Sequence, residues 1–142
     1  MKLRGKHAAI AVALVGGGVL ATSAFLFRND ILEMWHASRL ESKDPAERRA
    51  ALDALRGIAS GPSIPALLRI VEEDRSLREA ALALLLDASP RMHSVRRRDA
   101  ALSLRRMADR VDSDIALTVD HVYVALAAEC PDLFAASGQP IG

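Results

Sequence analysis

Apolar side chains recur at helical spacing along most of this chain. The segment 62–73 shows the pattern most clearly, with apolar residues at i, i+3, i+4 and i+7: Ile64, Leu67, Leu68 and Val71. This spacing places them on one face of an amphipathic α-helix. The same period, read together with cap and stop signals, predicts helices over about 29–42, 45–59, 62–73, 76–87, 92–111 and 113–129. The predicted fold class is therefore all-α.

The predicted helix 76–87 differs from its neighbours because it is apolar nearly all round. A helix of this kind must be covered on most sides. We therefore expect it to form the centre of the core, with Leu82 and Leu85 buried. At its start, Ser76 followed three residues later by Glu79 has the pattern of a capping box.

One stretch of the sequence is written twice, at a period of 30 residues. The matching positions pair Asp44 with Asp74, Arg48 with Arg78, Ala50 with Ala80, Ala51 with Ala81, Leu52 with Leu82 and Leu55 with Leu85. Self-similarity at such a period is typical of stacked supersecondary units. Because a second apolar helix lies between the copies, the predicted unit is a helical hairpin. Residues 98–102 echo the repeat at a different spacing, so the pairing of helices within 90–130 stays open.

The repeated stretch also resembles a known family. The sequence DPAERRAALDALRGIASGPSIPALLRIVEED over 44–74, followed by SLREAALALL over 76–85, is similar to HEAT repeats of the short form found in bacterial and bilin-lyase-like proteins. The match is good over about 40–90 and weak over 91–129. The resemblance implies a short α-solenoid whose second helices line a concave face that binds other proteins. It also implies that the repeated Asp and Arg residues bond between neighbouring repeats.

The first part of the chain predicts a membrane location. Twenty residues without a charge, 8–27, follow a basic start that holds Lys2, Arg4 and Lys6. As a helix they span about 30 Å, the thickness of the hydrocarbon core of a bilayer. An uncleaved signal anchor explains why the apolar run continues past the small residues 22–24. A signal peptide cleaved there and a buried soluble helix are the alternatives.

The excess of basic residues on the N-terminal side predicts that this end stays in the cytoplasm. The expected location is thus the bacterial cytoplasmic membrane, crossed once, with the C-terminal domain on the periplasmic side. Small residues recur every four positions in the apolar segment: Ala9, Ala13, Gly17 and Ala21. Such a stripe lets two membrane helices pack closely, although a segment rich in alanine and glycine also yields it by chance.

The predicted organisation has five parts. They are a cytoplasmic tail (1–7), a transmembrane helix (8–27), a linking or capping helix (28–43), a HEAT-like helical repeat domain (44–130) and a flexible tail (131–142).

The chain carries no recognisable catalytic or metal-binding motif. Its histidines, His7, His36, His93 and His121, are scattered and lack the spacing of metal ligands. The single cysteine, Cys130, excludes an internal disulfide. A net charge of +1 gives no case for nucleic acid as a partner. We expect no catalytic residue, no metal, no cofactor and no enzymatic activity.

The strongest local signal is charge. Seven arginines crowd into 91–110 with only two acids, whereas 112–132 carries five acids and no Lys or Arg. Four of the arginines recur at spacings of seven to eight, which we interpret as one helix flank: Arg97, Arg98, Arg105 and Arg106. This flank is a candidate dock for an acidic protein or for anionic lipid headgroups. The alternative is a solvated face that pairs with the acidic last helix.

Together these patterns predict a single-pass, membrane-anchored HEAT-repeat interaction protein, acting as a scaffold or an accessory subunit of a bacterial membrane complex. Its partner is expected to be a membrane-associated protein. The alternatives are a secreted or periplasmic HEAT-repeat protein after cleavage of a signal peptide, and a bilin-lyase-like HEAT protein.

Overall fold

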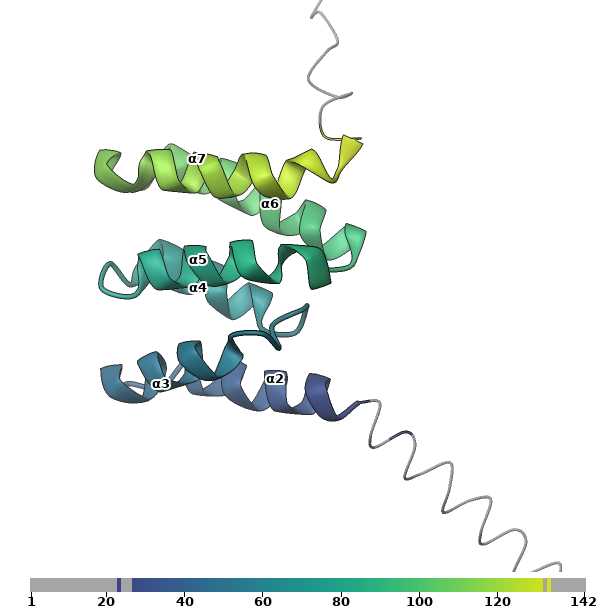
Figure 1. The fold of residues 1–142 in the computed structure, drawn as a ribbon. Helices are drawn as coiled ribbons and strands as arrows, with labels where there is room; N and C mark the ends of the chain where they lie inside the picture. The colour runs from purple at the N-terminus through teal and green to yellow at the C-terminus, as the bar shows by residue number, and fades with distance from the viewer. Residues whose placement is uncertain (1–22, 24–26, 132, 134–142) are drawn as a thin grey trace, which may run out of the picture. The chain divides into compact units, whose positions relative to one another are not determined.

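The structure, a computed structural model, describes residues 23, 27–131 and 133. Within them it contains α-helices and one short 3₁₀ helix, and no strand (Figure 1). The helices are α2 (Arg28–Arg39), α3 (Pro45–Leu55), α4 (Ile64–Glu73), α5 (Arg78–Ala88), η1 (Ser89–Arg91), α6 (Ser94–Ala108) and α7 (Ser113–Ala128). The all-α prediction is confirmed, and each helix lies where the apolar period placed it, to within a few residues at its ends.

The chain divides into two compact units, Met1–Leu32 and Glu33–Gly142. In the second unit α3, α5 and α7 lie side by side in one layer, and α4 and α6 lie in a second layer behind them (Figure 1). The most extensive contacts join α6 to α7, α4 to α5, and α5 to α7. Each helix of the first layer after α3 is therefore packed against one helix of the second layer.

Helix α5 is the centre of this unit because it contacts α3, α4 and α7. Leu82 and Leu85 are fully buried, as predicted. Burial of so many apolar side chains on one helix removes a large area from water, which is the main term that stabilises the packing. The fully buried large apolar side chains come from α3, α4, α5, α6 and α7: Leu55, Ile64, Leu67, Val71, Leu82, Leu85, Leu104, Val119, Val122 and Leu126.

Two local predictions differ from the structure. Helix α3 ends at Leu55 rather than near 59, because Gly57 takes a φ of +77°, a left-handed conformation that side chains disfavour and that ends helices. The predicted capping box at the start of α5 does not form. Instead, the hydroxyl of Ser76 donates to Oδ1 of Asp74 at 2.6 Å, and α5 begins at Arg78 without a side-chain cap.

The helices of the structure do not support the predicted membrane location. In the part of the chain that the structure describes, no helix has both the length and the apolar character needed to cross a membrane. Even α7 has 16 residues, whereas a bilayer needs about 20. This finding contradicts the predicted location in the bacterial cytoplasmic membrane, which we withdraw. The segment predicted to span lies outside the described residues, apart from Ser23 and Phe27.

Several other predictions also fall on residues that the structure does not describe. They are the tail 1–7, the small-residue stripe of Ala9, Ala13, Gly17 and Ala21, and most of 131–142.

Candidate protein-interaction surface

The repeated aspartates and arginines join neighbouring copies of the repeat. Nη2 of Arg48 lies 3.0 Å from Oδ2 of Asp74, an ion pair without full hydrogen-bond geometry. One repeat further on, Nη1 of Arg78 lies 3.3 Å from Oδ2 of Asp112. Asp112 is therefore the third member of the series. Its spacing from Asp74 differs from the repeat period, so the sequence pattern did not identify it. The series ends there, because the next arginine position is occupied by Ala116.

Arg78 also closes the end of α4. Its Nε donates to the carbonyl of Val71 at 2.6 Å and its Nη2 to the carbonyl of Glu72 at 3.2 Å. The last carbonyls of a helix lack partners within the helix, so a buried guanidinium is a suitable donor for them. This arginine is structural.

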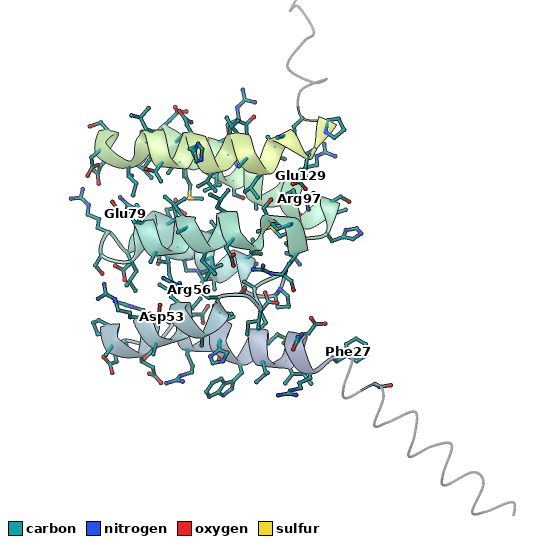
Figure 2. All side chains as sticks on the ribbon, in the orientation of Figure 1. Phe27, Asp53, Arg56, Glu79, Arg97 and Glu129 are labelled. Carbon is teal, nitrogen blue, oxygen red and sulfur yellow. The ribbon has the colours of Figure 1, made fainter. Side chains whose placement is uncertain are left out.

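The four arginines predicted to form one flank have different surroundings. Arg97 is internal: its side chain is 11% exposed and Nη1 lies 2.7 Å from Oε2 of Glu129 at the end of α7 (Figure 2). Its guanidinium also donates to the carbonyls of Ser89, at 3.1 and 2.8 Å, and of Met92, at 3.0 Å. Arg97 therefore joins the start of α6 to η1 and to the end of α7.

Arg98, Arg105 and Arg106 are exposed, but they do not share one flank. A helix turns by about 100° per residue, so Arg98 and Arg105 lie on one side of α6 and Arg106 lies about 100° around from Arg105. Arg106 bonds only weakly to its own helix among the described residues, donating to the carbonyl of Leu102 at 3.3 Å and to the hydroxyl of Ser103 at 3.2 Å.

Arg106 belongs to a groove between α4 and α6. The groove has a volume of about 480 Å³ and is lined by Pro65, Leu68, Arg69, Glu72, Glu73, Ser103, Arg106, Met107 and Arg110. Arg110 on its rim lies 3.6 Å from Glu72, and both side chains are at least half exposed. Between these charges, half-buried Leu68 and the edge of buried Met107 form the apolar floor of the groove.

A second groove adjoins the first along α4. It has a volume of about 690 Å³ and is lined by Leu40, Glu41, Arg48, Ala66, Arg69, Ile70, Glu73, Asp74, Arg75 and Ser76. Because Arg69 and Glu73 line both grooves, the two form one track over α4. Sequence reasoning missed this track. Its signal is the recurrence of Ala66, Arg69 and Glu73 at i, i+3 and i+7, on the side of α4 away from the core.

A buried carboxylate positions α4. Glu33 is fully buried and accepts hydrogen bonds from the backbone N–H groups of Ser60, Gly61 and Ser63, at 2.9 to 3.0 Å. The hydroxyls of Ser60 and Ser63 donate to it as well, at 2.8 and 2.6 Å. Burial raises the pKa of Glu33, but the hydrogen bonds from Ser63 and Ser60 outweigh burial and hold the pKa below its ordinary value. Nothing in the sequence pattern of α2 pointed to this role.

No group of three or more His, Cys, Asp or Glu side chains among the described residues is placed to hold a metal ion. His36, His93 and His121 lie on α2, before α6 and on α7, far apart in the sequence. Cys130 is a free, buried thiol at the end of α7. These side chains therefore do not converge on a site, and the grooves remain the candidate functional surface.

Comparison of the chain with protein-family models, with curated proteins and with solved structures finds no match.

Proposed function

We propose that this protein is a non-enzymatic interaction module, a short α-solenoid of HEAT-like repeats, that holds an acidic segment of another protein in the track over α4. The observation that carries the proposal is the groove between α4 and α6, where exposed arginines flank an apolar surface. HEAT-like packing is supported by two features of the second unit. One is the two-layer arrangement of its helices, and the other is the Arg–Asp contact that recurs between successive repeats.

The groove offers both kinds of contact that a protein segment needs. Three arginines and two carboxylates line it, so its formal charge is 3 − 2 = +1. The guanidinium groups of Arg106 and Arg110 are exposed and their present contacts are long, between 3.2 and 3.6 Å. A guanidinium binds an incoming carboxylate through two parallel N–H donors at shorter distance. Arg106 and Arg110 can therefore exchange weak internal contacts for stronger external ones.

The apolar surface defines the rest of the ligand. Leu68 and Met107 lie in the same groove as these arginines, and Leu40 and Ile70 line its continuation. The segment that fits best is thus an extended stretch in which acidic side chains alternate with apolar ones.

The test uses a fluorescent peptide of alternating glutamate and leucine and the full chain. We expect saturable binding that weakens as salt rises, since the contacts are between exposed charges. The double variant Arg106→Gln/Arg110→Gln should weaken binding about tenfold or more, which corresponds to about 1.4 kcal/mol.

The matched control is Arg98→Gln/Arg105→Gln, which removes the same charge from the other side of α6. Equal loss of binding in both variants contradicts the proposal, because a general charge effect then explains the result. Binding to anionic vesicles in place of the peptide contradicts it too. Circular dichroism and thermal melting check that both variants keep the fold.

A further inference from the structure

One ion pair lies within the track that the proposed function assigns to a partner. Arg69 is on α4, and Glu41 is in the turn after α2, 28 positions earlier in the chain. Nη1 of Arg69 donates to Oε1 of Glu41 at 2.6 Å. Arg69 lines both grooves, whereas Glu41 lines only the larger one. The guanidinium shared by the two grooves is therefore bound by a carboxylate of the chain itself.

This pair contributes little to the fold. The side chains of Arg69 and Glu41 are 55% and 57% exposed, and neither has a second hydrogen bond or ion pair among the described residues. Water and salt screen an ion pair between exposed side chains, so such a pair stabilises a fold only weakly. A neighbouring contact is more extensive, since Glu47 binds both Arg39 and Ser42. The bond between Arg69 and Glu41 can thus open without loss of the fold.

The bond also leaves most of the guanidinium unused. An arginine side chain has five N–H donors, and a carboxylate can bind two of them in parallel. Glu41 accepts from only one donor of Arg69. A carboxylate of a bound segment can therefore make a stronger, two-pronged contact with Arg69 than Glu41 makes.

The charge balance of the larger groove depends on Glu41. Three arginines and three acids line this groove, so its formal charge is 3 − 3 = 0: Arg48, Arg69, Arg75, Glu41, Glu73 and Asp74. When Glu41 leaves, the charge becomes 3 − 2 = +1, which equals that of the smaller groove. Both parts of the track then have the net positive charge that complements an acidic segment.

We infer that Glu41 is a built-in competitor of the acidic segment, and that Arg69 is the binding residue for which the two compete. The inference rests on the proposed function and deepens it, because it identifies a further binding residue of the same track and the contact that regulates it. In the free protein Glu41 occupies Arg69, and a partner whose carboxylate reaches Arg69 displaces it. A segment without acidic side chains has nothing to exchange for this bond, so the pair also selects for acidic partners.

The experiment measures binding of the fluorescent glutamate–leucine peptide to variants of the full chain. Glu41→Gln should bind the peptide about threefold to fivefold more tightly than the wild type, the gain expected when one exposed ion pair no longer competes. Arg69→Gln should bind it about fivefold more weakly or worse, because an exposed guanidinium contact is lost. The double variant Glu41→Gln/Arg69→Gln should bind as Arg69→Gln does, because Glu41 acts through Arg69.

Two further variants serve as controls. Glu79→Gln removes the same charge from α5, where the side chain is exposed and lines neither groove, and it should leave the affinity unchanged. The exchange Glu41→Arg/Arg69→Glu keeps an ion pair between these two positions with the charges reversed. It should keep the wild-type melting temperature and lose affinity for the peptide about tenfold or more, because α4 then presents an acid to an acidic ligand.

Equal binding by the wild type and Glu41→Gln overturns the inference and leaves the proposed function standing. A gain in affinity that persists without Arg69, or that Glu79→Gln reproduces, overturns it too, because a general charge effect then explains the result. If Glu41→Gln melts about 5 °C or more below the wild type, the pair is structural and the inference is also overturned. Absence of peptide binding in both the wild type and Glu41→Gln overturns the proposed function, and this inference with it.

Discussion

Two turns at corresponding places in the repeats are held by charged side chains of opposite sign, the fully buried Glu33 and the mostly buried Arg97. The turn from α3 into α4, at 60–63, surrounds the carboxylate of Glu33, which accepts bonds from three backbone N–H groups. The turn from α5 into α6, at 89–92, surrounds the guanidinium of Arg97, which donates to the carbonyls of Ser89 and Met92. Glu33 reaches its turn from α2, whereas Arg97 lies on α6, the helix into which its turn leads. Both side chains bond to backbone groups of the turn, although the carbonyl of Ser89 also accepts from the N–H of Met92 within it.

The difference follows from which backbone groups each turn exposes. Residues 60–63 lead directly into α4, and the first N–H groups of a helix lack partners and attract an anion. The 3₁₀ helix η1 ends at Arg91 and presents carbonyls, which require a donor. A repeat that is regular in its apolar positions can therefore use opposite chemistry in its turns. The comparison also explains why Arg97 is unavailable to a partner while Arg98 beside it is free.

Of the variants that test this comparison, Glu33→Ala should lower the free energy of unfolding most. It leaves the N–H groups of Ser60, Gly61 and Ser63 buried without their acceptor, which should cost about 3 kcal/mol of the free energy of unfolding. Urea unfolding followed by circular dichroism measures it. Acetate added at high concentration should restore part of the loss by occupying the empty anion position. A loss below about 0.5 kcal/mol shows that Glu33 does not hold the turn.

Arg97→Gln should have a somewhat smaller effect, about 2 kcal/mol, because the amide retains one donor while the bond to Glu129 and the others are lost. Arg98→Gln is the control, since its side chain is exposed and has no described partner, and it should change stability by less than about 0.5 kcal/mol. The same unfolding assay applies to both. Equal losses in the two variants contradict the internal role of Arg97.

The smallest effect is on the pH dependence of stability. The folded pKa of Glu33 lies below its ordinary value of 4.5, so its contribution is complete above that pH and is lost as pH falls through the folded pKa. Glu33→Gln should therefore be less destabilised by acid than the wild type, when each is compared with itself at pH 7.

The stability that Glu33→Gln still loses at acid pH should come from other carboxyl groups. Hydrogen bonds from Ser42, Ser76 and Arg91 lower the pKa values of Glu47, Asp74 and Asp87 respectively. If the melting temperatures of the wild type and of Glu33→Gln fall equally as the pH is lowered, the role assigned to Glu33 is contradicted.

Much of the fold could be predicted because the spacing of apolar residues is a local property of the chain. The positions of α4 and α5 and the burial of Leu82 follow directly from spacing and composition. The end of α3 was misplaced, because Gly57 competes with a stronger stop signal at 60–62 and only the folded backbone shows which one acts. Asp112 was missed as a repeat position because α6 is longer than α4 and lengthens the period.

The candidate site was predicted less well, for a geometric reason. Spacings of seven and eight do place pairs of residues near each other on a helix, such as Arg98 with Arg105. Arg97 and Arg106 are nine residues apart, however, which is about half a turn around the helix from each other. Which of the two faces the core depends on where α7 and α4 pack, and no charge pattern in the sequence contains that information.

The sequence by itself determined the all-helical class, the approximate helix positions, the apolar core and the repeat, because each depends on the spacing of side chains along one helix. Only the tertiary structure decided which arginines are internal, where the grooves lie and which ion holds each turn. Most of those outcomes depend on contacts between residues far apart in the sequence, such as Glu33 with Ser63 and Arg97 with Glu129. Such contacts form because packing buries backbone groups that then require a partner.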